Sequence, residues 1–407
     1  MTSQQVLASE RLMPPTMAHV LHSSSDSTVS FDLPARARGA SPFFMTRASG
    51  PALVLGRVRV FNRSMATASF ALHLPGTYHV EVLLLFEHFD FDAFEHTFRG
   101  HDTYPGGHCM RLNDVVHEAT LQLHARANLA GAGHHLAAQW IHEEVGPTSL
   151  LRPAVQTRWQ LLSTGPGDYA PNCSVDNGMP IASLQRYASY RWGHINQVSG
   201  AFVASTVRNA TRGGGVCLLG ASHARKICAM IEDCIYFEVR FFTSRVHYAR
   251  NTTNGASASI MRNVTARIGA ERLCDQIVVT TGQWDGGFPM HRLTSLRMFS
   301  DELAASVRLL RQLLLNISVP IGLSLMTTNY NPPNCQNSLC PATDWRAPPV
   351  IDAYNAKIQE LAVAESLRLV NLEPIIGPVW DAASDWCHPD LKVLEAEATA
   401  VLDATQS

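Results

Sequence analysis

The chain has 407 residues, of which 46% are hydrophobic and 16% charged, and so many apolar side chains exclude wholesale disorder because they can bury a sizeable core. Lysine and arginine together number 32 against 34 acidic residues, so the chain lacks the basic excess of nucleic-acid-binding proteins. No apolar run reaches the roughly 18 residues that a membrane-spanning helix needs. At about 100–200 residues per domain, the length predicts two or three domains.

The N-terminal third is predicted to be an all-β module. Residues 1–27 are polar, contain no apolar core typical of a signal peptide, and are expected to be disordered. From residue 28, apolar residues alternate with polar ones in short runs that are separated by Gly, Pro and Asn turns. This period of two predicts a β-sandwich over residues 28–142, with the clearest strands within 53–60, 70–74, 80–84 and 115–123. A helical pattern is expected only over residues 127–142.

Residues 143–210 are predicted to connect this module to the rest of the chain. Five prolines interrupt the stretch, and Trp and Tyr residues are interleaved with them. We interpret it as a connecting segment with strand fragments, in which the aromatic side chains are packing anchors rather than a ligand cage.

Beyond residue 210 the pattern changes to alternating strands and helices, which predicts an α/β domain over residues 211–407. Helices between successive strands favour right-handed crossovers and a parallel sheet that is covered on both faces. Sites in such sheets form at the carboxyl ends of the strands. The expected strands are 215–220, 235–242, 276–281, 319–326 and 368–372, and helices are expected up to 232 and over 256–273, 300–315, 350–367 and 390–402.

Ser222 follows the first of these strands, two positions after Gly220. A serine in a tight turn between a buried strand and a helix has its hydroxyl at the carboxyl edge of the sheet. The helix N-terminus offers free N–H groups where an oxyanion would form. The alternative is a common one, namely a serine that only caps the helix.

Asp385 and His388 lie three residues apart after the last strand. With this spacing the carboxylate can orient one imidazole nitrogen while the other faces a serine hydroxyl. The alternative is a loop with a capping Asp and a surface His. The serine after the first strand and the Asp–His pair after the last strand support each other as signals. A distance above about 5 Å from Oγ of Ser222 to the His388 side chain would count against catalysis.

In three blocks the chain resembles the GDSL/SGNH hydrolase superfamily, and most closely its PC-esterase branch, which includes the trichome-birefringence-like and neurexophilin-and-PC-esterase types. The blocks are Gly220–His223, Thr281–Asp285 and Asp385–His388, and Arg346–Asn355 is similar to the stretch before the family's last helices. The resemblance implies a three-layer, flavodoxin-like domain. The N-terminal module is similar to the immunoglobulin- or filamin-like domain that precedes such esterase domains.

The resemblance also implies roles for individual residues. Ser222 would be the nucleophile, His388 the general base and then the general acid, and Asp385 the residue that holds the imidazole. The backbone N–H groups of Ser222 and of the Gly282–Gln283 region would hold the oxyanion. No cofactor and no metal are implied.

The sequence departs from the family pattern in two of its blocks. Ala221 stands where the family usually has Asp, and Gln283 and Trp284 stand where its third block often supplies an Asn. Relatives act on acylated, mainly acetylated, glycans, so the resemblance implies a serine esterase or an O-acyltransferase with an acylated glycan as substrate. The alternative is a non-catalytic glycan- or protein-binding or adhesion protein, which the two departures favour and the intact Ser, Asp and His disfavour.

The compartment is indicated by Asn-x-Ser/Thr sequons and by cysteines. Chance predicts about two sequons, yet the chain has six, which favours a glycosylated protein of the secretory pathway (Golgi lumen) or the extracellular space over accidental matches. Of the nine cysteines, Cys335 and Cys340 are expected to form a local disulfide, whereas Cys217 and Cys228 are expected to be buried thiols. The sequons are at Asn62, Asn172, Asn209, Asn251, Asn263 and Asn316.

The N-terminal half is rich in histidine, which raises the question of a metal site. His135 and His142, seven apart and followed by Glu143 and Glu144, could share one helix face. Solvated or packed histidines are the better interpretation. His223 and Arg225, just after Ser222, could face the substrate or lie on the helix surface.

Overall fold

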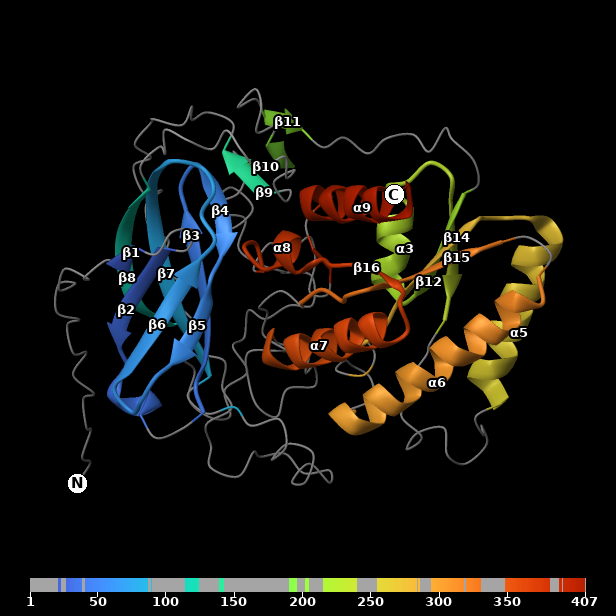
Figure 1. Ribbon diagram of the computed structural model, residues 1–407, viewed down its shortest axis with the longest axis horizontal. Coiled ribbons are helices and arrows are strands. Elements are labelled where there is room, and N and C mark those ends of the chain that lie inside the picture. Colours follow the sequence, from blue (N-terminus) through green and yellow to red (C-terminus); the bar gives the residue numbers. More distant parts are fainter. Residues whose placement is uncertain are drawn as a thin grey trace, which may run out of the picture.

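The computed structural model consists of a β-sandwich beside an α/β layer structure (Figure 1). No helix within its described residues is both long and apolar enough to cross a bilayer. These residues are 21–22, 27–38, 41–86, 89, 114–123, 139–142, 190–195, 202–204, 215–239, 255–283, 285, 294–317, 320–330, 348–380, 388–389 and 391–406.

The N-terminal part contains two antiparallel sheets. The first has four strands in the order β1 (Leu21–His22), β2 (Ser27–Asp32), β6 (Met65–Phe70) and β5 (Arg57–Val60). The second has seven, in the order β11 (Phe202–Ala204), β10 (Tyr190–Ile195), β9 (Gln139–His142), β4 (Ala52–Leu55), β3 (Phe43–Ser49), β7 (Gly76–Phe86) and β8 (Asp114–Leu123).

The two sheets pack face to face, so the predicted β-sandwich is confirmed. Alternate residues of each sheet point into one shared apolar cluster, as the period of two requires. It includes Val29 and Phe31 from one sheet and Val80 and Val82 from the other, and all four side chains are almost fully buried.

Gly56 separates two strands where the sequence indicated one continuous run. The preceding strand, β4, belongs to the seven-stranded sheet, and the following strand, β5, belongs to the four-stranded sheet. A Cβ on Gly56 would lie 2.4 Å from Phe70 and 2.7 Å from Thr46, so only glycine fits where the chain crosses between the sheets.

The prediction of a helix over residues 127–142 is wrong at its end, where β9 forms instead. β9 pairs with β4 on one side and with β10 on the other. Both partners are distant in sequence, so local periodicity could not reveal the strand. β10 and β11 lie in the predicted connecting segment, and β1 lies in the N-terminal segment for which we expected no structure.

The C-terminal part confirms the predicted α/β class. Its five strands are all parallel, in the order β13 (Cys234–Glu238), β12 (Val216–Gly220), β14 (Gln276–Thr280), β15 (Gly322–Met326) and β16 (Arg368–Val370). The helices lie in two layers, α3 (Ser222–Cys228) and α9 (Leu391–Gln406) on one face and α5 (Gly255–Glu271), α6 (Leu296–Leu315) and α7 (Pro348–Ala364) on the other (Figure 1).

The burial of these elements follows from their residue patterns. β12 is apolar throughout and buried at every position, as a central parallel strand should be. Helix α6 begins after Ser295, whose hydroxyl accepts a hydrogen bond from the N–H of Met298 and so caps the helix. Its buried side chains recur every three or four residues, namely Phe299, Leu303, Val307 and Leu310.

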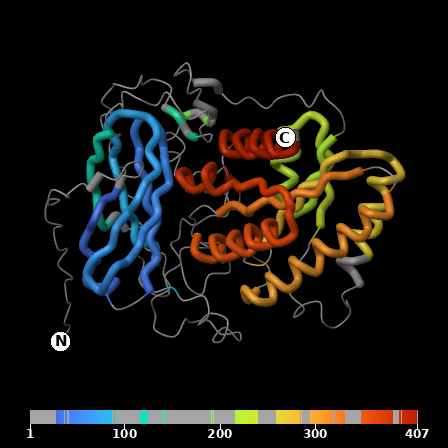
Figure 2. The backbone as a smooth tube through the Cα atoms, viewed as in Figure 1, coloured from blue at the N-terminus to red at the C-terminus, as the bar shows by residue number. Residues whose placement is uncertain are grey.

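The sandwich and the α/β part share one apolar core. Leu83 and Leu85, on the outer face of the seven-stranded sheet, belong to the same buried cluster as the strands β12 and β14. The short helix α8 (Glu373–Ile376) ends at Gly377, where a Cβ would lie 2.5 Å from Leu55 of the sandwich. The seven-stranded sheet is therefore covered on both faces. The backbone trace shows the β-sandwich and the α/β part next to each other (Figure 2).

Two disulfides correct the prediction of buried thiols. Cys217 of β12 is bonded to Cys274, and Cys228 at the end of α3 is bonded to Cys234 at the start of β13. The first pairing depends on β12 and β14 being neighbours, which the sequence order does not reveal. The expected bridge between Cys335 and Cys340 lies outside the described residues.

Candidate active site

The candidate site lies at the carboxyl edge of the parallel sheet, where the strand order reverses. Strand β12 comes first in sequence but lies between β13 and β14, so the connections after β12 and β14 lead to opposite faces. Such a switch point leaves a crevice outside the strand ends. Because Leu219 pairs with Val279, Ser222 and Gly282 lie equally far beyond this pair.

Ser222 is placed by the tight turn that the sequence predicted. A Cβ on Gly220 would lie 2.4 Å from the Thr280 side chain, so β12 and β14 approach each other too closely for a larger residue. Ala221 is the N-cap of α3 and has no side-chain cap, and Ser222 is the first helical residue. Ser222 is half-buried at the positive end of α3.

The structure brings His388 to Ser222 across 166 positions of the sequence. Nε2 of His388 lies 3.0 Å from Oγ of Ser222, which is hydrogen-bonding distance. His388 is half-buried and lies three residues before the start of α9. Asp385, the predicted third member, lies outside the described residues.

Gly282 and Gln283 differ in what they can offer an oxyanion. Gly282 has a φ of +99°, a conformation that glycine adopts without strain. Gln283 is buried, and its Nε2 donates to Oγ1 of Thr328 at 2.8 Å, to the carbonyl of Asn329 at 2.7 Å and to Oδ1 of Asn329. The side-chain amide of Gln283 therefore holds the loop after β15, and the backbone N–H groups remain the candidates at these two positions.

Asn329 is a residue that the sequence analysis missed. It is 1% exposed, and its Nδ2 has no hydrogen-bond partner among the described residues, although its Oδ1 is paired. Asn355 supports the same loop, because its side chain accepts from the N–H of Thr328 and donates to the Thr328 carbonyl. The rule that singled out Ser222 would have found Asn329 too, since it is a polar residue just beyond a buried parallel strand.

Asp285 adds a buried carboxyl behind the same edge. It is 1% exposed, and burial raises its pKa well above the ordinary value, only partly offset by a hydrogen bond from Thr294. Tyr354 fixes this loop by donating its hydroxyl to the Thr294 carbonyl at 2.6 Å. Burial therefore disfavours the ionised form of this carboxyl.

His223 is buried. The two interpretations of this residue, that it faces the substrate or that it lies on the helix surface, are therefore both wrong. It is 2% exposed, and its Nε2 lies 2.8 Å from Oε2 of Glu397 on α9. Arg225 is exposed on the same helix, which agrees with the interpretation that it lies on the helix surface.

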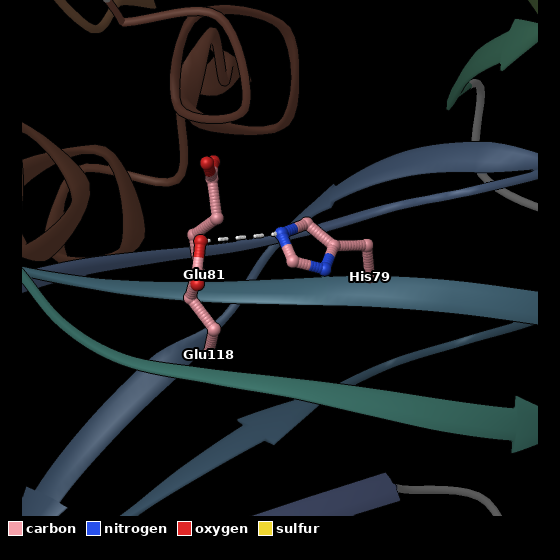
Figure 3. A group of neighbouring side chains, drawn as sticks. All are labelled: His79, Glu81 and Glu118. Atoms are coloured by element: carbon pink, nitrogen blue, oxygen red, sulfur yellow. Dashed lines mark ion pairs between the residues drawn. The ribbon is translucent and has the colours of Figure 1, made fainter. Parts of the chain in front are cut away.

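Among the described residues, one group of side chains resembles a set of metal ligands, and it lies on the β-sandwich. Ligand atoms of His79, Glu81 and Glu118 lie within 4.8 Å of one another on β7 and β8, and an ion pair joins His79 to Glu118 (Figure 3). Arg47, however, is 1% exposed and donates to Glu81 at 2.8 Å. Its guanidinium would repel a bound cation, so we interpret the group as a row of paired polar side chains across the sheet. His135 and the side chain of His142 lie outside the described residues.

Three of the six sequons fall within the described residues. Asn62, Asn263 and Asn316 are all exposed, in a hairpin turn, within α5 and at the end of α6. The other three lie outside the described residues.

Comparison with solved structures finds similarity over about half of the chain. A carbohydrate acetylesterase from Sinorhizobium meliloti is 10% identical, with 48% of this chain and 99% of that chain covered and a TM-score of 0.32. An acetylxylan esterase from Geobacillus stearothermophilus is 17% identical, with 49% and 95% covered and a TM-score of 0.29. At such TM-scores the likeness does not establish a family or an activity for this chain. No family model matches the sequence. No curated protein matches it.

Proposed function

We propose that this protein is a serine esterase or O-acyltransferase that acts on acyl, chiefly acetyl, esters of glycans. The observation that carries the proposal is the 3.0 Å contact between Oγ of Ser222 and Nε2 of His388 at the switch point of the sheet. A nucleophile in hydrogen-bonding reach of a base is the arrangement that acyl transfer through serine requires. Asp385 is assigned as the third member, which orients the imidazole.

The reaction has two halves. The Ser222 hydroxyl donates its hydrogen bond to Nε2 of His388, and His388 takes the proton as the oxygen attacks the ester carbonyl. The imidazolium then gives this proton to the sugar oxygen as the ester C–O bond breaks, so that the sugar departs as an alcohol and an acyl-enzyme remains. Water, or a hydroxyl of a second sugar, accepts the acyl group in the reverse sequence.

The tetrahedral oxyanion needs hydrogen-bond donors. The backbone N–H groups of Ser222, Gly282 and Gln283 lie at the ends of adjacent strands, and each donor of this kind contributes on the order of 3 kcal/mol to the transition state. The backbone of Ser222 lies at the start of α3, where N–H groups have no intrahelical partner.

We further propose that the esterase unit is of the SGNH, PC-esterase-like type, that it comprises residues 211–407 and that the β-sandwich before it is of the immunoglobulin or filamin kind. The two disulfides support a protein that folds in an oxidising compartment, because such bonds rarely persist in the reducing cytosol. The secretory pathway or the extracellular space is the proposed location.

The test is acetate release from a panel of acetylated polysaccharides, with and without an unacetylated acceptor glycan. We expect release or transfer by the wild type, a loss of at least about 1,000-fold in Ser222→Ala, and no change in Ser259→Ala, a control at an exposed serine of α5. Folded protein that binds these glycans but neither releases nor transfers acetate would favour the non-catalytic binding function.

A further inference from the structure

The buried pair of His223 and Glu397 has no role in the chemistry described so far. Nε2 of His223 and Oε2 of Glu397 are 2.8 Å apart, and the two side chains are 3% and 0% exposed. Charged or polar side chains are rarely buried to this extent without a specific reason. The position is notable because His223 directly follows the proposed nucleophile.

Among the residues that the structure describes, this contact is the one hydrogen bond that these side chains make. Nδ1 of His223 and Oε1 of Glu397 are buried and have no hydrogen-bond partner in the described part of the chain. If α9 shifted along α3, both groups would lose this contact while still excluded from water, which is the costliest state for a buried polar group. The pair therefore resists relative movement of the two helices more than apolar contacts would.

Two contacts join the start of α3 to the segment that contains His388 and α9. Ser222 and His223 are neighbours at the start of α3, whereas their partners, His388 and Glu397, lie just before α9 and within it. The two helices pack against each other on one face of the sheet (Figure 1). The far end of α3 is anchored to β13 by the disulfide of Cys228. Because the disulfide fixes the end of α3, the contact between His223 and Glu397 fixes the position of α9 relative to α3.

We propose that His223 and Glu397 are positioning residues, which hold α9 and the preceding His388 at hydrogen-bonding distance from Ser222. This inference rests on the proposed function. A displacement of about 1 Å between a nucleophile and its base can lower the rate by about 100-fold. Loss of the pair should therefore reduce kcat and the reactivity of Ser222, and leave KM almost unchanged because neither side chain is exposed to substrate.

Three variants separate positioning from stability. Glu397→Gln keeps a neutral hydrogen bond to His223. Glu397→Leu removes it and leaves His223 buried without a partner. The double variant His223→Phe, Glu397→Leu replaces the whole pair with hydrocarbon, a change that often preserves or raises stability. Glu395→Leu, at an exposed position of the same helix, is the matched control.

The readouts are the thermal midpoint, kcat and KM on an acetyl ester such as 4-nitrophenyl acetate, and the second-order rate of inactivation by a fluorophosphonate. We expect Glu397→Gln to stay within about threefold of the wild type, and Glu397→Leu and the double variant to lose at least about tenfold in kcat and in inactivation rate at unchanged KM. The double variant should do so while folded, and Glu395→Leu should match the wild type.

A folded double variant with the wild-type inactivation rate would overturn the positioning role, and so would a Glu397→Gln variant as slow as Glu397→Leu. If no variant of the pair folds, the pair is a general stability element and the assignment is wrong. A folded wild type that the fluorophosphonate does not modify would instead overturn the proposed function itself, before any variant is compared.

Discussion

Replacing Asp352 by Asn should remove a defined part of the pH dependence of stability. Asp352 lies on α7, and its Oδ1 accepts a hydrogen bond from the Tyr330 hydroxyl at 2.6 Å. Burial raises the pKa of this carboxyl from 3.8 to about 7, with a smaller upward effect of Glu373 and opposing effects of Tyr330 and of Arg57. Arg57 belongs to the sandwich strand β5 and pairs with Glu373 at 3.8 Å. The carboxyl therefore titrates near the contact between the two parts of the molecule.

The sign follows from the two protonation states. The unfolded carboxyl ionises near pH 4 and the folded one near pH 7, so the stability present below pH 4 is lost as the pH rises to 7. The shift from 3.8 to about 7, roughly 3 pH units, corresponds to about 4 kcal/mol at 1.36 kcal/mol per unit. Asn is neutral at every pH and still accepts a hydrogen bond from Tyr330.

The assay is urea unfolding followed by tryptophan fluorescence at pH 5 and pH 8. We expect Asp352→Asn to exceed the wild type in unfolding free energy by on the order of 4 kcal/mol at pH 8 and by roughly 1–2 kcal/mol at pH 5. Asp301→Asn, whose side chain is 73% exposed on α6, is the control and should show no such difference. An equal effect of Asp352→Asn at the two pH values would show that the pKa of Asp352 is not raised by folding.

Three further predictions concern the fold and the compartment. Gly220→Ala would place a Cβ 2.4 Å from the Thr280 side chain and should lower the unfolding free energy by roughly 1–3 kcal/mol, together with activity, as urea unfolding and acetate release would show. Replacing both Cys217 and Cys274 by Ala opens a loop with a sequence separation of 57 and should cost about 4 kcal/mol; an unchanged thermal midpoint would contradict this. Protein secreted from a eukaryotic host should carry a glycan on the exposed Asn62, seen as a mobility shift that an N-glycosidase abolishes and that is smaller in Asn62→Gln.

The sequence predicted the α/β half well because its signals are local. Each strand of the parallel sheet is a short apolar run, and each helix carries its own periodicity, as α6 does with Leu303, Val307 and Leu310. The position of Ser222 also followed from local features, namely a buried strand, a Gly and a helix start.

What the sequence could not supply were contacts between distant segments. β9 forms because β4 and β10 lie beside it, and the crossing between the sheets requires a glycine at position 56 because Phe70 and Thr46 fill the space around it. The disulfide of Cys217 and the pair of His223 with Glu397 likewise join segments that become neighbours only in the folded chain. Asn329 could have been predicted from the sequence, because it is a polar residue just after a buried strand, as Ser222 is.

The most direct test of the central claim is covalent modification of the folded protein by a fluorophosphonate, mapped by peptide mass spectrometry. We predict a single modified residue, Ser222, and at least about a 100-fold slower modification in His388→Ala, because His388 activates the hydroxyl at 3.0 Å. Modification at another serine, or an undiminished rate in His388→Ala, would contradict it.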